Sequence, residues 1–309
     1  MVCLRNKRGG CQTSEDYLGI LGYADDNFLI APTMESLQEM LYTCEEYALE
    51  HNLKFSTNPV LAKCKTKCLA FLFKSRDLRK LKLCGNDLPW DDHGKHLGNT
   101  IENSINGLVK DILTKRARYI QRNNELIQEF HYAHPKTLFD INLIYNGHFT
   151  GSPLWDIFSK EAEMFEKTWN TSVRTMYDLP RNSHKYFVEE ISGSPHLKSI
   201  LIRRFLNFTE QIKNSKKKAL KNVFQKMRKN CQSVTGSNLR KIMLLVGKHN
   251  VDDLEVSDAY KVKYTVVPDD DLWRLDLANE ITEIKFGDLQ VEGFTWNELQ
   301  ENLNKVCTN

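Results

Sequence analysis

The spacing of apolar and polar residues predicts a β-hairpin near the start of the chain. Residues 17–23 are rich in β-forming and small apolar residues, residues 27–31 are again apolar, and Asp25-Asp26-Asn27 between them has turn chemistry. We therefore expect two strands with two adjacent carboxylates at the tip that joins them. Because both strands are nearly free of charge, we also expect them to be covered on both faces.

A helix and several short strands follow this hairpin. Thr33 is a suitable N-cap, and the apolar residues after it recur at helical spacing, which predicts an amphipathic helix over residues 34–51. A turn signal at Gly85-Asn86-Asp87 separates two of the strand candidates that come next. Those candidates are residues 53–56, 66–73, 78–84 and 96–101.

Beyond residue 103 the pattern is almost entirely helical. It begins with a long helix over 104–131 that has a basic face, and it continues with helices at 136–148, 159–178, 184–192, 195–213, 216–230, 237–248, 270–285 and 295–306. The predicted fold class is α+β, with antiparallel strands and one helix first and helices afterwards. We expect domains at residues 1–102, 103–192 and 193–309.

The composition is that of an ordinary globular protein, with 41% hydrophobic and 27% charged residues in a chain of 309. No apolar run reaches the length of a membrane span, and the N-terminus has no apolar core of the signal-peptide type. Cys64 and Cys68 have no second pair at zinc-site spacing, so we assign no metal to cysteine. We expect an intracellular protein, cytoplasmic or nuclear.

Charge is distributed unevenly, although the net charge is only +3. Residues 211–250 contain no Asp or Glu and have a charge of +11, whereas residues 251–309 contain 14 acidic and five basic residues, a net charge of −9. Such blocks either face each other or serve different partners. For the basic block, a solvated helix surface and a nucleic-acid contact are both open interpretations.

The paired carboxylates Asp25 and Asp26 also allow two interpretations. Neighbouring acids are most often a solvated turn, but two carboxylates held close together repel each other unless a cation relieves them. Mg²⁺ takes carboxylate oxygens and keeps several waters, so an accessible hairpin tip would suit it.

Further motifs resemble, in order, the palm and thumb of LINE-type (non-LTR retrotransposon) reverse transcriptases. Tyr23-Ala24-Asp25-Asp26 is similar to the catalytic YADD turn of that family, and Lys95-His96-Leu97-Gly98 is similar to its primer-grip hairpin. The remaining matches are Leu53-Lys54-Phe55-Ser56 with Lys65-Thr66-Lys67, Gly151-Ser152-Pro153-Leu154-Trp155-Asp156, and Leu179-Pro180-Arg181-Asn182-Ser183-His184.

The resemblance implies RNA-directed DNA synthesis on an RNA template with a DNA primer, using two Mg²⁺ ions. It implies that Asp25 is a metal ligand, that Asp26 has a lesser role in the same site, and that Lys65 matches the lysine proposed to protonate pyrophosphate. Lys63 and Lys67 are equally well placed by spacing. The primer-grip residues would be His96, Leu97 and Gly98. Candidate contacts to nucleic acid are Lys115, Arg116, Arg118, Arg122, Lys216, Lys217, Lys218 and Lys221.

The sequence departs from the family at the third catalytic carboxylate. Only 24 residues precede Asp25, and Asp16 lies nine residues before it on the same strand arm, about 30 Å away if that arm is extended. We therefore expect a truncated reverse transcriptase that is inactive alone. Two alternatives remain open, a non-catalytic nucleic-acid-binding protein and an unrelated helical scaffold with an accidental acidic turn. The sequence leaves the oligomeric state open.

Overall fold

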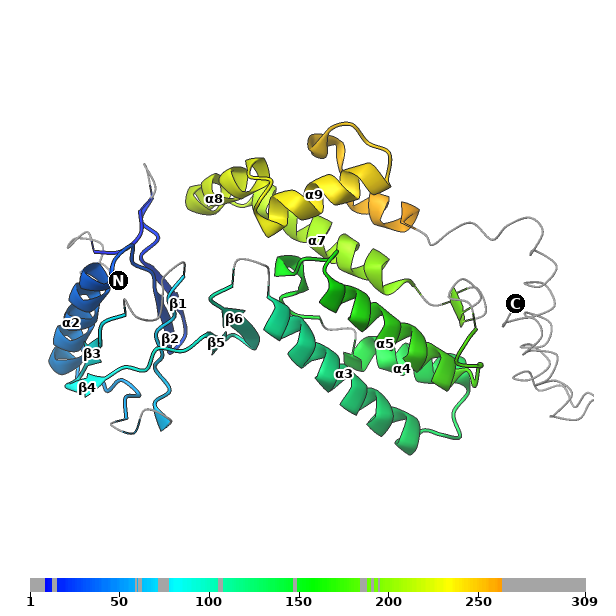
Figure 1. Ribbon diagram of the computed structural model, residues 1–309, viewed down its shortest axis with the longest axis horizontal. Helices are drawn as coiled ribbons and strands as arrows, with labels where there is room; N and C mark the ends of the chain where they lie inside the picture. The colour runs from blue at the N-terminus through cyan, green and yellow to red at the C-terminus, as the bar shows by residue number, and fades with distance from the viewer. Residues whose placement is uncertain are drawn as a thin grey trace, which may run out of the picture. The chain divides into compact units, whose positions relative to one another are not determined.

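The computed structural model mixes helices with small antiparallel strand pairs (Figure 1). Its described residues form two compact units. Unit 1 contains described residues up to Lys110 together with Gln211–Ser233, and unit 2 contains Asp111–Glu210 and the described residues from Val234 onward. The chain therefore enters unit 1 twice, and the basic block 211–250 is divided between the units. The structure describes residues 9–12, 16–58, 60, 63–71, 78–104, 108–146, 149–183, 188–189, 192–193 and 195–262.

Unit 1 contains three β-hairpins among its described residues, each a separate antiparallel pair. They are β1 (Ile20–Tyr23) with β2 (Asp26–Leu29), β3 (Lys82–Leu83) with β4 (Asn86–Asp87), and β5 (His93–His96) with β6 (Asn99–Glu102). The expected antiparallel strands are thus confirmed, but they do not combine into a larger sheet within the described residues.

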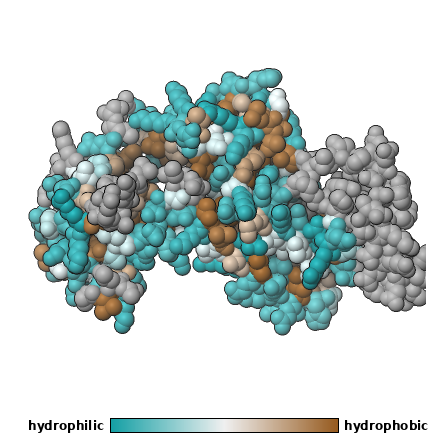
Figure 2. Space-filling model, in the orientation of Figure 1, coloured by the Kyte–Doolittle hydropathy of each residue, from teal (hydrophilic) through white to brown (hydrophobic). Residues whose placement is uncertain are grey.

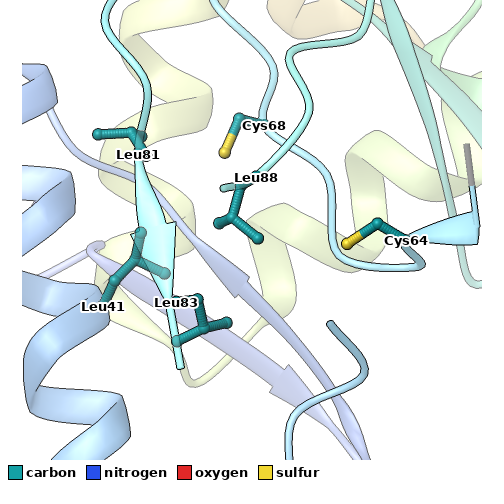
Figure 3. Close-up of a cluster of buried hydrophobic side chains, with 6 residues drawn as sticks. All are labelled: Leu41, Cys64, Cys68, Leu81, Leu83 and Leu88. Atoms are coloured by element: carbon teal, nitrogen blue, oxygen red, sulfur yellow. The ribbon is translucent and has the colours of Figure 1, made fainter. Parts of the chain in front are cut away.

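Helix α2 (Met34–Glu50) confirms the first predicted helix. The Thr33 hydroxyl accepts a hydrogen bond from Ser36 N at 3.1 Å, which satisfies one of the unpaired amides at the helix start. α2 contributes Leu41 to a buried cluster that also contains Cys64, Cys68, Leu81, Leu83 and Leu88 (Figure 3). Burial raises the pKa of the Cys68 thiol to about 12, with a further contribution from Cys64, so this thiol is protonated at neutral pH.

The strands predicted at 53–56, 66–73 and 78–84 are mostly wrong. Residues 53–56 form no strand, the described part of 66–73 has only an isolated bridge from Cys68 to Trp90, and 78–84 supplies only the short β3. Some of their apolar side chains, such as Cys68 and Leu81, fill the buried cluster from loops, whereas Leu53 is exposed. Two of these loops are linked, because Ser56 O accepts from Thr66 N at 3.3 Å and from Thr66 Oγ1 at 3.1 Å.

The strand predicted at 96–101 contains a turn. β5 ends at His96, Leu97 and Gly98 form the loop, and β6 begins at Asn99. Leu97 has φ of 49° and Gly98 has φ of 77°, the left-handed values that a tight hairpin turn requires. A turn of this kind reverses the chain within the predicted strand.

Unit 2 is built from helices around an aromatic core. Its elements are α3 (Val109–Glu129), α4 (Pro135–Asn146), η3 (Ser152–Leu154), α5 (Lys160–Met176), most of α7 (Leu197–Asn214), α9 (Val234–Leu245), η4 (Val251–Asp253) and η5 (Val256–Lys261). The rings of Tyr119, Phe149 and Phe165 contact one another, with 5.2 Å between the centroids of the two phenylalanines. The helices predicted at 104–131, 136–148, 159–178, 195–213 and 237–248 are confirmed with small shifts at their ends. Those at 270–285 and 295–306, and part of 184–192, lie outside the described residues.

A hydrogen-bonded group around Trp155 ties three elements of unit 2 together. The fully buried Trp155 donates from Nε1 to Asp111 Oδ2 of α3 at 2.8 Å. Asn238 of α9 donates to Trp155 O at 2.8 Å and accepts from Ile157 N at 3.3 Å. Because each of these polar groups is buried, their hydrogen bonds fix how α3 and α9 pack around the loop.

The basic helix α8 (Lys218–Lys229) belongs to unit 1, close to the expected range of 216–230. Asn222 donates to Asp16 Oδ2 at 3.1 Å, and Phe224 is buried. No helix among the described residues is long and apolar enough to span a membrane. On the face shown in Figure 2, hydrophilic residues cover most of the coloured surface and hydrophobic residues occur in separate groups.

Candidate functional site

The two predicted metal ligands lie at the tip of the β1–β2 hairpin but not in equivalent positions. Tyr23 pairs with Asp26, so the loop consists of Ala24 and Asp25. Ala24 has φ of 50°, as the first position of such a tight turn requires. The turn predicted at Asp25-Asp26-Asn27 is therefore shifted, because Asp26 is already the first residue of β2. The Asp25 side chain therefore projects from the turn, whereas the Asp26 side chain projects from strand β2.

The hairpin is exposed, and the expectation that both faces are covered was wrong. Leu21 is 51% and Tyr23 65% exposed, and Asp25 and Asp26 are both exposed. Among the described hairpin residues, Leu29 packs against the buried cluster and Phe28 against His96, whereas the outer residues of both strands are left uncovered. The low charge of these strands therefore does not reflect burial.

The donor set at the tip fits a hydrated Mg²⁺ only in part. Two accessible carboxylates provide the hard oxygen ligands that this ion prefers. Within the described residues, however, no group of three or more Asp, Glu, His or Cys side chains could hold a metal ion. We therefore derive no reaction step through a metal at this site. The described residues offer Asp25 and Asp26 as two of its ligands and no third.

The hairpin that carries the primer-grip-like motif meets the first one. The ring of His96 at the end of β5 lies 5.6 Å from the ring of Phe28 on β2, centroid to centroid. Leu97, which is 45% exposed, occupies the left-handed region that normally favours glycine, at a cost of about 1–2 kcal/mol. The Cys84-Gly85 turn has the same left-handed pair, so these values follow from a two-residue hairpin.

The three lysines that spacing could not distinguish differ in the structure. Lys67 donates to Asp91 Oδ2 at 2.5 Å, and this ammonium lowers the pKa of the Asp91 carboxyl. Lys63 and Lys65 are exposed. Lys67 is thus held by a neighbouring carboxylate, whereas the exposed Lys65 keeps the assignment that the resemblance gives it as a prediction.

The basic residues predicted on the long helix do not share one face of α3. Lys115 points into unit 2, where its side chain is only 11% exposed and its ammonium lies 3.2 Å from Asp111. Arg116 donates from Nε to Thr168 Oγ1 of α5 at 2.7 Å. Arg118 and Arg122 are exposed on the opposite side of the helix from Arg116. Lys115 therefore neutralises a core carboxylate, and a common nucleic-acid face can include at most part of this set.

The lysines around the start of α8 remain on the surface. Lys216, Lys217, Lys218 and Lys221 are all exposed, and α8 has no acidic residue. The same unit carries the β1–β2 and β5–β6 hairpins. The structure thus assigns these lysines and both candidate hairpins to one compact unit, although nearly 200 residues separate Asp25 from Lys221 in the sequence.

Comparison with models of known protein families, with curated proteins and with solved structures finds no match for this chain. The geometry of the described residues is therefore the basis for the functional argument.

Sequence reasoning missed a groove in unit 2, which lies between α3 and α5 and is lined mainly by polar residues. Four hydroxyl residues at helical spacing on α5 line this groove: Thr168, Thr171, Ser172 and Thr175. Each of the two helices also contributes one cation, Arg116 from α3 and Lys167 from α5. This periodicity was readable in the sequence. A stripe of hydroxyls is usually solvated, however, and only the neighbouring helix turns it into one wall of a groove.

Proposed function

We propose that the chain is a palm-and-thumb portion of a LINE-type reverse transcriptase, which contributes part of the active site for RNA-directed DNA synthesis. The Asp25 carboxylate would bind Mg²⁺ directly, with Asp26 beside it and Lys65 near the leaving pyrophosphate. A further carboxylate would come from a polymerase segment outside the described residues. The metal ions would activate the primer hydroxyl and neutralise the triphosphate.

The main support for this proposal is the ring contact between Phe28 and His96. Two motifs matched independently in sequence, YADD and K-H-L-G, lie on hairpins more than 60 residues apart and meet through these side chains. A polymerase needs this proximity, because the primer end must be held where the metal-bound nucleotide reacts. Phe28, two residues after Asp26 on β2, makes this contact, so it joins the hairpins that carry the two motifs.

The other matched segments support the same arrangement. Leu53-Lys54-Phe55-Ser56 and Lys65-Thr66-Lys67 are joined by the hydrogen bonds from Thr66 to Ser56 O. The Leu97-Gly98 turn presents an exposed backbone with left-handed dihedral angles, which suits contacts made to the primer by main-chain groups.

The chain by itself is expected not to extend a primer on an RNA or DNA template with Mg²⁺ or Mn²⁺. Two carboxylates without a third cannot hold the two ions at the separation of about 3.5–4 Å that this chemistry uses. The measurement is incorporation of labelled nucleotide by the purified chain. Template-dependent incorporation that is lost in Asp25→Ala would contradict the expected inactivity and would mean that the site is complete in this chain.

A non-catalytic nucleic-acid-binding protein is the second candidate, and the acid-free exposed helix α8 favours it. Lysines that neutralise phosphates release counterions, so affinity falls with salt by about 0.7–0.9 in the log–log slope for each phosphate. Replacing Lys216, Lys217 and Lys218 by Gln is expected to reduce the slope by about 2, measured by fluorescence anisotropy from low to moderate salt.

A matched control for this measurement is Lys136→Gln with Lys80→Gln, which removes exposed lysines that already pair with Asp140 and Asp87. These substitutions are expected to leave the slope unchanged. A slope that stays the same in the triple variant would mean that the start of α8 is a solvated surface and not a phosphate contact.

A further inference from the structure

His93, the first residue of strand β5, lies between two side chains of opposite charge. Its ring nitrogen Nδ1 is 2.8 Å from the Lys110 ammonium and 3.4 Å from Asp91 Oδ1. Both partners therefore approach the same atom of the ring. The His93 side chain is 37% exposed, so the ring can exchange protons with water.

The two partners need opposite protonation states of this nitrogen. An ammonium has three donors and no acceptor, so Lys110 can donate to Nδ1 only when that nitrogen carries a lone pair. The ring is then neutral, with its hydrogen on Nε2. A protonated Nδ1 is a donor, so it can bond to the Asp91 carboxylate, and the charged ring is repelled by the ammonium. Protonation of His93 thus exchanges one partner for the other.

The Asp91 carboxylate is held ready as the alternative partner. Its Oδ2 accepts from Lys67 at 2.5 Å, and its Oδ1 accepts from Asp92 N at 2.8 Å. The hydrogen bond from Lys67 lowers the pKa of the Asp91 carboxyl. Asp91 therefore remains ionised over the range of pH in which histidine side chains gain a proton.

Lys110 is also joined to the β5–β6 hairpin through its backbone. Its N–H, one of the amides that a helix leaves unpaired at its start, donates to Glu102 Oε1 at 3.0 Å. Glu102 is the last residue of β6 and pairs with His93 in the strand register. Paired side chains of neighbouring strands lie close together, so a charged His93 attracts the same carboxylate. Lys110 is the last residue of unit 1 before the chain continues into unit 2.

The other charged residues beside His93 are directed elsewhere or exposed. Asp92 Oδ1 accepts from Asn103 Nδ2 at 3.5 Å. Lys95, two residues further along β5 and therefore on the same face, is exposed. Among the charged groups that the structure describes, Lys110 and Asp91 are the two in contact with Nδ1. The charge of the ring therefore decides which of them it binds.

We propose that His93 is a pH-sensitive latch that joins the β5–β6 hairpin to the first turn of α3. Histidine side chains change charge between about pH 5 and 8. At the upper end of this range the neutral ring holds the Lys110 ammonium while Glu102 holds the Lys110 amide. At the lower end the charged ring bonds to Asp91 and competes for Glu102, so both links to Lys110 weaken. The inference concerns regulation of the fold and does not depend on polymerase activity.

The test is amide hydrogen exchange of the full chain, followed by mass spectrometry of peptides that cover the first turn of α3, from about pH 5.5 to 8. Rates are corrected for the intrinsic pH dependence of exchange. Protection of this turn in the wild-type chain is expected to fall by about 5-fold as the pH is lowered, the effect of losing about one hydrogen bond. His93→Gln stays neutral and its amide oxygen can accept from Lys110, so its protection is expected not to change with pH.

Further variants separate the latch from other titrations. His131→Gln removes an exposed histidine just beyond the other end of α3 and is expected to keep the wild-type pH dependence. Lys110→Met removes the ammonium but keeps an unbranched side chain, and it is expected to lower protection at high pH and to reduce the change with pH. Lys80→Met, at an exposed lysine of the same unit, is expected to do neither.

A second readout needs no variant. Nitrogen NMR of the chain with labelled histidines is expected to show neutral His93 with its hydrogen on Nε2, because Lys110 donates to Nδ1. The opposite tautomer would overturn the proposal. So would a first turn of α3 whose protection is independent of pH in the wild-type chain, or a pH dependence that survives in His93→Gln.

Discussion

On the proposed function, Asp25→Asn is expected to abolish primer extension in an active fusion of this chain with the fingers and first palm strand of a LINE-type element. Joined upstream of Tyr17, that segment would bring the third carboxylate to the hairpin tip. Asn keeps the shape of the side chain but removes the charge that a divalent ion requires. Loss of several kcal/mol of charge stabilisation corresponds to a rate decrease of at least about a thousandfold. Steady-state incorporation on a primed RNA template measures it.

Asp26→Asn in the same fusion is expected to leave a reduced but measurable rate. Asp26 is the first residue of β2, whereas Asp25 lies in the turn, so the two side chains leave backbone of different conformation. The two carboxylates therefore cannot bind the same ions equally. Asp92→Asn, an exposed position in the same unit, serves as the control. If both tip variants kept the full rate of an active fusion, the tip would be only a turn.

Asp111→Ala is expected to destabilise unit 2 by about 3–5 kcal/mol, because it removes one partner of a buried ion pair. Asp111 is 1% exposed and Lys115 11%, and Asp111 also accepts the Trp155 indole hydrogen bond. The substitution removes the carboxylate partner of the buried Lys115 ammonium and of the buried Trp155 indole N–H. Urea unfolding followed by tryptophan fluorescence gives the difference in free energy of unfolding.

Asp140→Ala is a closely matched control for this measurement. Asp140 also pairs with a lysine four residues away on one helix, at the same 3.2 Å as the Asp111 pair, but its side chain is 52% exposed. Exposed ion pairs contribute less than about 1 kcal/mol, so only a small loss is expected. Similar losses in the two variants would mean that burial does not strengthen the Asp111–Lys115 ion pair. Lys115 would then again be a candidate contact to nucleic acid.

Helices were largely predictable from the sequence because their signals are local. The Thr33 cap and the apolar spacing after it define α2, and the basic run around Lys218 defines α8. Strands were not predictable in the same way. The apolar residues Cys68 and Leu81 signal burial, but burial in a cluster formed largely from loops gives the same alternation as burial in a sheet.

The candidate site was predictable where motifs are short and contiguous. The YADD and K-H-L-G segments each form a hairpin, and the left-handed Leu97-Gly98 turn explains why the second one reverses at these residues. Their proximity through Phe28 and His96 could not be read from the sequence, because it depends on how two separate hairpins pack. The exposure of the first hairpin depends in the same way on which elements pack over the faces of its strands.

The sequence by itself determined which residues are chemically able to act: the adjacent carboxylates at a turn, the acid-free basic helix and the spacing of the helices. Tertiary structure alone decided which of them are available. Lys115 forms an ion pair with Asp111, and Trp155, from a distant loop, helps to bury that carboxylate. Arg116, one residue later, faces α5 and lines a groove. One position along a helix rotates a side chain by about 100°, and only the packing of neighbouring helices decides whether that direction leads into the core or to a groove at the surface.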